Sequence, residues 1–327
     1  MAILKVNSLK KYFTVQRRLL SRPLFLKAVD GINISLDEDR IFALVGESGC
    51  GKSTVARLIL RLMVPTSGEV MFKGKNIFEL KKDALRVFRK SVQIIFQDPF
   101  ASLNPRKSIM DTLSEPLKIY RIVEKNKLKD KVVELLNKVG LASDMLYRYP
   151  HELSGGQRQR VCIARSLAVS PRIIVADEPL SALDVSIQAQ ILNLLQELKK
   201  EYRLSFLFIS HDLKVVHYFS DTIGVMYLGK IVEYSKTEDL FIEPFHPYTE
   251  VLLSSAPSIP TYSLGPPRAM GMHHMMGEVP SPIDIPSGCP FHPRCPKRFE
   301  PCDKVVPVLK QVQDKESNGR FVSCHLF

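Results

Sequence analysis

Short apolar segments alternate with helical patterns over roughly the first 250 residues of this chain. Four continuous apolar runs, each bounded by Gly, Pro, Asp or charged residues, predict buried strands: Ile41–Val45, Val92–Phe96, Ile173–Ala176 and Phe206–Ser210. Helical spacing predicts an amphipathic helix over 125–139, in an inserted helical subdomain that we place at about 98–170. This alternation indicates the α/β class, with a parallel sheet covered by helices.

Two departures from this pattern suggest further structure. Residues 69–72 and 75–78 flank Lys73-Gly74 and predict a hairpin, so an antiparallel patch should accompany the parallel sheet. After Pro244, prolines recur too often for regular helix. We therefore predict a first domain over 1–250, a linker rich in Pro, Gly and Met over 251–277, and a small loop-rich domain over 278–327.

Composition narrows the class of protein. Of the 327 residues, 45% are hydrophobic and 24% are charged, which excludes a disordered or fibrous chain. Apolar runs end after four or five residues, too short to span a bilayer, and charged or polar residues between Lys5 and Lys27 interrupt any secretory signal. The net charge of +12 suits nucleic acid, phosphate ligands or an anionic membrane surface. We interpret the chain as cytoplasmic.

A glycine-rich motif follows the first predicted strand. Residues 46–53 satisfy G-x-x-x-x-G-K-[ST], and helical spacing resumes directly after them. Backbone N–H groups and the helix N-terminus can hold phosphates there, with Lys52 adding charge and Ser53 a ligand for Mg²⁺. The predicted phosphate-binding residues are Gly46, Glu47, Ser48, Gly49, Cys50, Gly51, Lys52, Ser53 and Thr54.

Two adjacent carboxylates end the strand over 173–176. Neighbouring strand residues point to opposite sides, so Asp177 can reach Mg²⁺ while Glu178 faces an attacking water and takes its proton. Acidic residues at a strand end are often only solvated. Together with the phosphate motif, the pair indicates a nucleotide hydrolase.

A second glycine-rich turn, Leu153-Ser154-Gly155-Gly156-Gln157, precedes another helical pattern. It is either a second phosphate grip or a helix cap formed by Ser154. In this order, the motifs resemble the ATP-binding subunits of ABC transporters over residues 3–250. The resemblance implies a P-loop ABC ATPase core in which two such domains pack head to tail, each ATP lying between the phosphate loop of one and the signature turn of the other.

The same resemblance implies roles for four further positions. Gln97 would sense Mg²⁺ and water and link to the membrane subunits, and His211 would contact the γ-phosphate. Residues 181–184, ending at Asp184, would cross the dimer interface, and Ser181 or Asp184 can also act as a helix N-cap. Tyr12, with Phe13 as the alternative, would stack on adenine.

Several segments are most similar to the second ATPase type of the peptide importers: residues 96–106, 154–160, 246–249 and 277–282. This implies a subunit on the cytoplasmic face of the membrane that powers import of di- or oligopeptides. Its expected partners are two membrane-spanning permease subunits, a second ATPase subunit (a different paralogue or a second copy) and, indirectly, an extracytoplasmic solute-binding protein. Related importers carry oligosaccharides or nickel.

Two other classes of protein compete with this interpretation. A soluble ABC ATPase acting on nucleic acid or ribosomes would suit the charge, but the basic residues are interspersed with acids and form no single track, so we expect no nucleic-acid partner. A small-molecule kinase would leave the signature turn without a role.

Four cysteines gather near the C-terminus: Cys289, Cys295, Cys302 and Cys324. From spacing alone, a [4Fe–4S] cluster, a Zn²⁺ site and ordinary thiols all stay open, with His292 and His325 within reach in sequence. The resemblance favours the cluster, since some peptide-importer ATPases carry one on similarly placed cysteines. Cys50 and Cys162 we interpret as structural.

Overall fold

The computed structural model describes residues 2–16, 23–255, 277–312 and 319–327. Two compact units make up the described chain. The first contains Asp37–Arg40 and Glu79–Ile209, and the second contains Ala2–Leu36, Ile41–Phe78 and Ser210–Phe327. Among the described helices, none combines the length and apolarity needed to cross a bilayer.

The first unit is built on three parallel strands, β6 (Val92–Ile95), β7 (Ile173–Asp177) and β8 (Ser205–Ile209). Every residue of β7 and β8 is buried, as continuous apolar strands of a covered parallel sheet should be. Its helices are α2 (Lys82–Ser91), α3 (Pro99–Ser102), α4 (Ile109–Ile119), α5 (Leu128–Lys138), α6 (Gly155–Leu167) and α7 (Val185–Tyr202). Short 3₁₀ turns occupy Lys125–Lys127, Ser143–Tyr147 and Pro150–Glu152.

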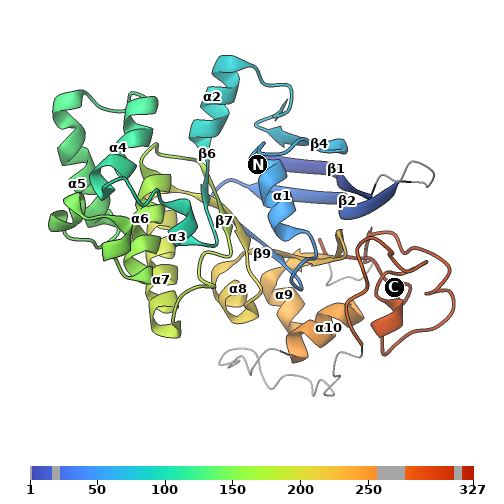
Figure 1. The fold of residues 1–327 in the computed structure, drawn as a ribbon. Coiled ribbons are helices and arrows are strands. Elements are labelled where there is room, and N and C mark those ends of the chain that lie inside the picture. The colour runs from blue at the N-terminus through green and yellow to red at the C-terminus, as the bar shows by residue number, and fades with distance from the viewer. Residues whose placement is uncertain (1, 17–22, 256–276, 313–318) are drawn as a thin grey trace. The chain divides into compact units, whose positions relative to one another are not determined.

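Helices α4, α5 and α6 pack on one another and form the helical part of this unit (Figure 1). The predicted amphipathic helix is present: the turn over Lys125–Lys127 leads into α5, whose Val132, Leu135 and Leu136 are buried. The opposite face of α5 is rich in Lys, Asp and Glu, so the helix is stabilised by burial of this one apolar stripe.

The second unit contains two sheets. One is antiparallel, in the order β2 (Leu24–Asp37), β1 (Ala2–Gln16), β4 (Ser67–Phe72) and β5 (Lys75–Asn76). In the other, β3 (Ile41–Val45) runs parallel to β9 (Thr222–Tyr227), and β9 is antiparallel to β10 (Lys230–Lys236). This mixed sheet with a separate antiparallel sheet confirms the predicted fold class, and the β4–β5 pair confirms the predicted hairpin. The unit's helices are α1 (Lys52–Ile59), α8 (Leu213–Phe219), α9 (Thr237–Ile242) and α10 (Pro247–Ser254).

The C-terminal tail joins this second sheet. Strand β12 (Phe321–Val322) pairs antiparallel with β10 and with β11 (Lys310–Gln311). Val322 and Cys324 pack with Phe245 in a small apolar cluster. Helix α10 lies within the proline-rich run that was predicted to exclude regular helix, and it can begin there because Pro247 occupies its first turn, where no N–H partner is required. It ends at Ser254, four residues beyond the predicted boundary at 250. Most of the predicted linker, residues 256–276, lies outside the described residues, and the division at 250 and 277 stays a prediction.

Candidate functional site

The phosphate loop lies between β3 and α1 in the second unit. Gly46, Gly49 and Gly51 all have positive φ, at 149°, 79° and 114°. A Cβ on Gly46 would lie 2.1 Å from the carbonyl oxygen of Met226, and one on Gly51 would lie 2.0 Å from that of Ala28. Two of these glycines are therefore required by close backbone contacts with β9 and β2, in addition to their dihedral angles.

The start of α1 offers positive charge to an anion. Its N-cap, Gly51, provides no side-chain cap, and no acidic residue stands in the first turn, where Ser53 and Thr54 follow Lys52. The Lys52 ammonium is buried and donates hydrogen bonds to the carbonyl oxygens of Gly46 (2.8 Å) and Glu47 (3.0 Å). The loop thus has the backbone and charge of a phosphate site.

Two residues from beyond position 240 contact this loop, and sequence reasoning assigned neither of them. The Glu47 N–H donates to the Tyr248 hydroxyl at 2.9 Å, and the Glu47 carboxylate accepts two hydrogen bonds from Arg294. Burial raises the pKa of Tyr248, so its hydroxyl stays protonated. No motif near Tyr248 or Arg294 predicts a contact with Glu47, which lies more than 200 positions away in the sequence.

In the first unit, parallel strands bring two predicted residues together. Residues Ile95 and Ala176 pair near the carboxyl ends of β6 and β7, and just beyond them Gln97 Nε2 donates to Glu178 Oε2 at 3.0 Å. Glu178 has a φ of 46°, an uncommon conformation for a residue other than glycine. Asp177, the last residue of β7, is 7% exposed. The structure therefore places an amide and two carboxylates at one edge of this sheet.

The signature turn caps α6. The Ser154 hydroxyl accepts from the Gln157 N–H at 3.3 Å, and the Gln157 side chain accepts from the Ser154 N–H at 3.0 Å, which is a capping box. Gly156 packs so closely that a Cβ there would lie 2.7 Å from Ile187 Cγ2. The predicted helix cap at Ser154 is thus present, and Ser154 and Gly155 lie exposed at the start of α6.

The loop over 181–184 is braced from both sides. The Ser181 hydroxyl donates to the Glu178 carbonyl at 3.1 Å, and Gln188 Nε2 donates to the carbonyls of Leu180 (3.1 Å) and Leu183 (3.0 Å). Asp184 stands at the N-cap position of α7, but its side chain makes no capping hydrogen bond. A cap therefore does not account for the acidic side chain at this position.

His211 lies in the second unit, between β8 and α8, and is exposed. The residues around it are fixed locally: the Asp212 N–H donates to Ser210 Oγ at 3.0 Å, and the Asp212 carboxylate caps α8 by accepting from Lys214 N–H at 2.9 Å. His211 thus lies on a turn in which hydrogen bonds fix both of its neighbours, Ser210 and Asp212.

Tyr12 lies on β1 and makes polar contacts of its own. Its hydroxyl donates to Asp30 Oδ1, and Lys27 Nζ lies 5.8 Å from its ring centroid. Burial, followed by the Asp30 contact, raises the pKa of Tyr12 to about 12. These contacts fix the ring without testing the adenine assignment, which stays a prediction.

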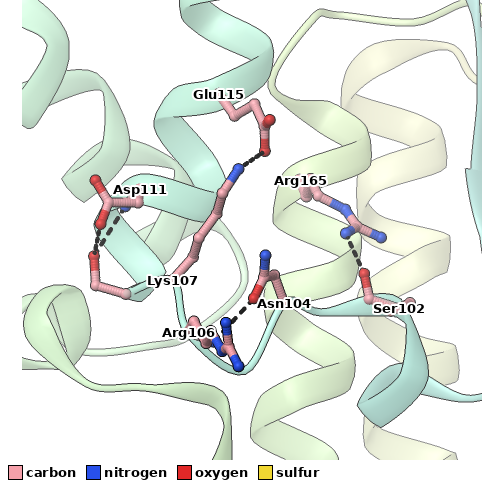
Figure 2. A network of polar contacts seen from close by, with 8 residues as sticks. Ser102, Asn104, Arg106, Lys107, Asp111, Glu115 and Arg165 are labelled. Carbon is pink, nitrogen blue, oxygen red and sulfur yellow. Dashed lines mark hydrogen bonds and ion pairs between the residues drawn. The ribbon is translucent and has the colours of Figure 1, made fainter.

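A polar network holds the segment that follows Gln97 (Figure 2). Arg165 Nη1 donates to the Ser102 carbonyl at 2.6 Å, the Arg106 N–H donates to Asn104 Oδ1 at 2.9 Å, and Lys107 pairs with Glu115 at 2.9 Å. The Asp98 side chain caps α3 directly after Gln97. Residues 98–108 are therefore an ordered, hydrogen-bonded connection between Gln97 and α4.

The four tail cysteines line one cavity, together with His246, Phe291, His292 and His325. None forms a disulfide, and each lies close enough to the other three to interact with their charges. Burial raises the pKa of Cys289 to about 11 and also raises the pKa values of Cys295 and Cys324, with neighbouring thiols adding to the effect. As they stand, no three Cys, His, Asp or Glu side chains of the described residues are arranged to hold a metal ion.

The remaining two cysteines, Cys50 and Cys162, lie far from the tail in sequence. Cys50 and Cys162 are buried, and burial raises the pKa of each thiol. Cys162 Sγ lies 3.1 Å from Ser102 Oγ, within the packing of α6 against the 98–102 segment.

Comparison with known proteins identifies the class. The ABC transporter family matches residues 29–181. The ATP-binding cassette MJ0796, solved as a dimer in a post-hydrolysis state bound to ADP and Pi, is 28% identical, with a TM-score of 0.63, over 72% of this chain and 98% of that one. This chain is an ABC-type ATPase.

The comparisons also identify a family within the ABC-type ATPases. The C-terminal region of oligopeptide/dipeptide transporters matches residues 232–302. The oligopeptide transport ATP-binding protein AppF of Bacillus subtilis is 47% identical over 99% of this chain and 97% of its own length. The dipeptide transport ATP-binding protein DppF of Haemophilus influenzae is 46% identical over 98% and 96%. The chain belongs to the ATP-binding subunits of oligopeptide/dipeptide ABC transporters and is the ATPase that powers peptide import.

Proposed function

We propose that this subunit hydrolyses ATP with the phosphate loop of one chain and the signature turn of a facing ATPase subunit. The single observation that supports this most strongly is the loop itself, whose glycines, buried Lys52 and uncapped α1 suit a polyphosphate. The uncovered start of α6 at Ser154 is a second anion-binding position on the same chain. A head-to-tail pair of subunits would give both positions a role.

Glu178 is the general base in this proposal. Its carboxylate is held by Gln97 at 3.0 Å, an arrangement that would orient it toward a water beside the γ-phosphate. Ser53, Gln97 and Asp177 offer the hydroxyl, amide and carboxylate oxygens that Mg²⁺ prefers. Bound Mg²⁺ would neutralise charge on the phosphates. His211 would donate to the γ-phosphate, Asp184 would face the partner subunit, and Tyr12 would contact adenine.

The residue assignment can be tested with Glu178→Gln. The amide keeps the size of the side chain and its contact with Gln97 but cannot accept the proton of the attacking water. We expect ATP binding to persist, turnover to fall by about 100-fold or more, and ATP to hold subunits together as dimers. Equilibrium binding, phosphate release and molar mass measured in ATP check the three parts. Hydrolysis at the wild-type rate would remove Glu178 from this role.

The partners follow from the transporter class. We propose that two membrane-spanning permease subunits and a second ATPase subunit, either a paralogue or another copy of this chain, assemble with it at the cytoplasmic face of the membrane. The hydrogen-bonded segment over 98–108, next to Gln97, is the part of the first unit that we expect to transmit movement to the permeases. An extracytoplasmic solute-binding protein would supply the peptide.

The tail cavity is proposed to hold a [4Fe–4S] cluster, with Zn²⁺ as the alternative. Four free thiols share one cavity, which is the donor set that either centre uses. The raised pKa values of Cys289, Cys295 and Cys324 keep these three thiols protonated in the absence of a cation, so metal binding would release protons. A centre bound there would join segments around residues 289, 302 and 324.

Metal analysis of protein purified without oxygen distinguishes the two centres. We expect about four iron and four sulfide per chain, and loss of both in Cys302→Ser and Cys324→Ser. Cys162→Ser, which alters a buried thiol elsewhere, should keep the iron. One zinc per chain without sulfide would replace the cluster by Zn²⁺, and metal-free protein would leave the cysteines as ordinary thiols.

A further inference from the structure

An arginine of the tail is bonded to the phosphate loop. Arg294 Nη1 and Nη2 donate to the two carboxylate oxygens of Glu47 at 2.9 and 3.0 Å. The Arg294 side chain is 5% exposed and that of Glu47 is 17% exposed, so the pair is largely removed from solvent screening. Two parallel hydrogen bonds fix the direction of the carboxylate as well as its charge.

The Arg294 side chain is held in place by aromatic residues. The Arg294 backbone N–H donates to the Phe291 carbonyl at 3.0 Å, in the 3₁₀ turn His292–Arg294, and Phe291 is buried. The Phe291 ring contacts those of Tyr227 (5.4 Å) and Tyr248 (5.3 Å). Tyr227 also accepts a hydrogen bond from Arg294 Nη1 at 3.4 Å, and Tyr248 accepts from the Glu47 N–H. These contacts fix the guanidinium against the Glu47 carboxylate.

The loop creates an electrostatic problem that this contact solves. Glu47 is the second residue of a loop that must bind a polyanion, and a free carboxylate there would repel phosphate. It would also compete for Lys52, whose ammonium already lies 3.0 Å from the Glu47 carbonyl oxygen. Pairing with Arg294 offsets the charge of the carboxylate and occupies both of its oxygens, so the carboxylate competes less with the ligand for Lys52.

We propose that Arg294 is a positioning residue of the ATP site, which holds Glu47 so that the phosphate loop and Lys52 can receive the nucleotide. This inference rests on the proposed function of the loop. It makes the C-terminal tail a working part of the nucleotide site, acting through Glu47 without touching the reacting atoms.

The test compares Arg294→Met with the double variant Arg294→Met/Glu47→Gln, using ATP hydrolysis by the full chain in its assembled transporter. Arg294→Met leaves the Glu47 carboxylate without its arginine partner. We therefore expect the KM for ATP to rise about tenfold or more while kcat stays within about threefold. Removing the stranded charge in the double variant should recover most of the KM. Arg294→Lys keeps the charge without the two parallel bonds and should be intermediate.

Controls separate this inference from the function beneath it. Arg298→Met removes an exposed arginine of the same tail, 3.9 Å from Asp303, and should leave KM unchanged. Lys52→Ala should abolish hydrolysis, and normal hydrolysis by that variant would refute the proposed function. Loss of activity in Lys52→Ala together with a wild-type KM in Arg294→Met would overturn the role of Arg294 alone.

The double variant guards against a purely structural explanation. If Arg294 only packs the tail, adding Glu47→Gln cannot restore the KM, and a double variant as impaired as the single one would also overturn the proposal. Should Arg294→Met fail to fold, Arg294→Lys compared with Arg294→Lys/Glu47→Gln makes the same comparison, with the same two outcomes.

Discussion

The three positive-φ glycines of the phosphate loop differ in what surrounds them. Gly46 and Gly51 face backbone carbonyls at about 2 Å from a built Cβ, whereas the space around Gly49 is open. Glycine is therefore needed for different reasons within one loop. Gly49 needs only the positive φ, whereas Gly46 and Gly51 need the positive φ and also have no room for a Cβ beside a backbone carbonyl.

This difference predicts unequal costs for the same substitution. Gly49→Ala should lower the free energy of unfolding by about 1 kcal/mol, because only the left-handed backbone is strained. Gly51→Ala should cost about 3 kcal/mol or more, because the Ala28 carbonyl must also move. Urea unfolding of the two variants checks this. Equal midpoints would show that the close contact with Ala28 carries no stability.

Residue-level contacts also mark where sequence reasoning ends. Gly46–Ser53 could be predicted because the motif is local and lies between a strand and a helix. The Arg294–Glu47 pair could not, because its residues are 247 positions apart and neither belongs to a motif that predicts the contact. An arginine in a proline-rich tail reads as an ordinary solvated charge until the fold is known.

At the scale of elements, the continuous apolar strands and the β4–β5 hairpin were predicted, whereas the two long strands β1 and β2 were not. β3, β7 and β8 were found within one residue at each end, because burial on both faces leaves an uninterrupted apolar run. β1 was not predicted, because an irregularity between Asn7 and Lys10 breaks the alternation of its apolar residues. β2 was missed although residues 32–36 alternate, a pattern typical of a half-buried strand. The helical subdomain was predictable from the spacing in α5 and the capping signal at Ser154.

The start of α6 shows how one element serves structure and function together. Ser154 closes a capping box that accounts for its residue type, yet the same geometry leaves the helix start exposed. Aspartate is as good an N-cap as serine. Ser154→Asp should therefore keep α6 and place a negative charge where a phosphate of a facing subunit would lie.

At the scale of the whole molecule, the two proposed phosphate-binding positions belong to different compact units. The tail is tied to one of them: β12 extends the sheet of the second unit, and Arg294 bonds its phosphate loop. A run of prolines sets the tail apart in the sequence, but its contacts join it to β10 and to the loop that contains Glu47.

The most direct test of the account measures ATP binding and ATP turnover in Ser154→Asp, with molar mass recorded during turnover. We predict that the isolated chain binds ATP as the wild type does, because its own phosphate loop is intact, and that its stability to unfolding is unchanged. Turnover should fall by about 100-fold once subunits assemble. A verified monomer of this variant that hydrolyses ATP at the wild-type rate would contradict a site shared between two subunits.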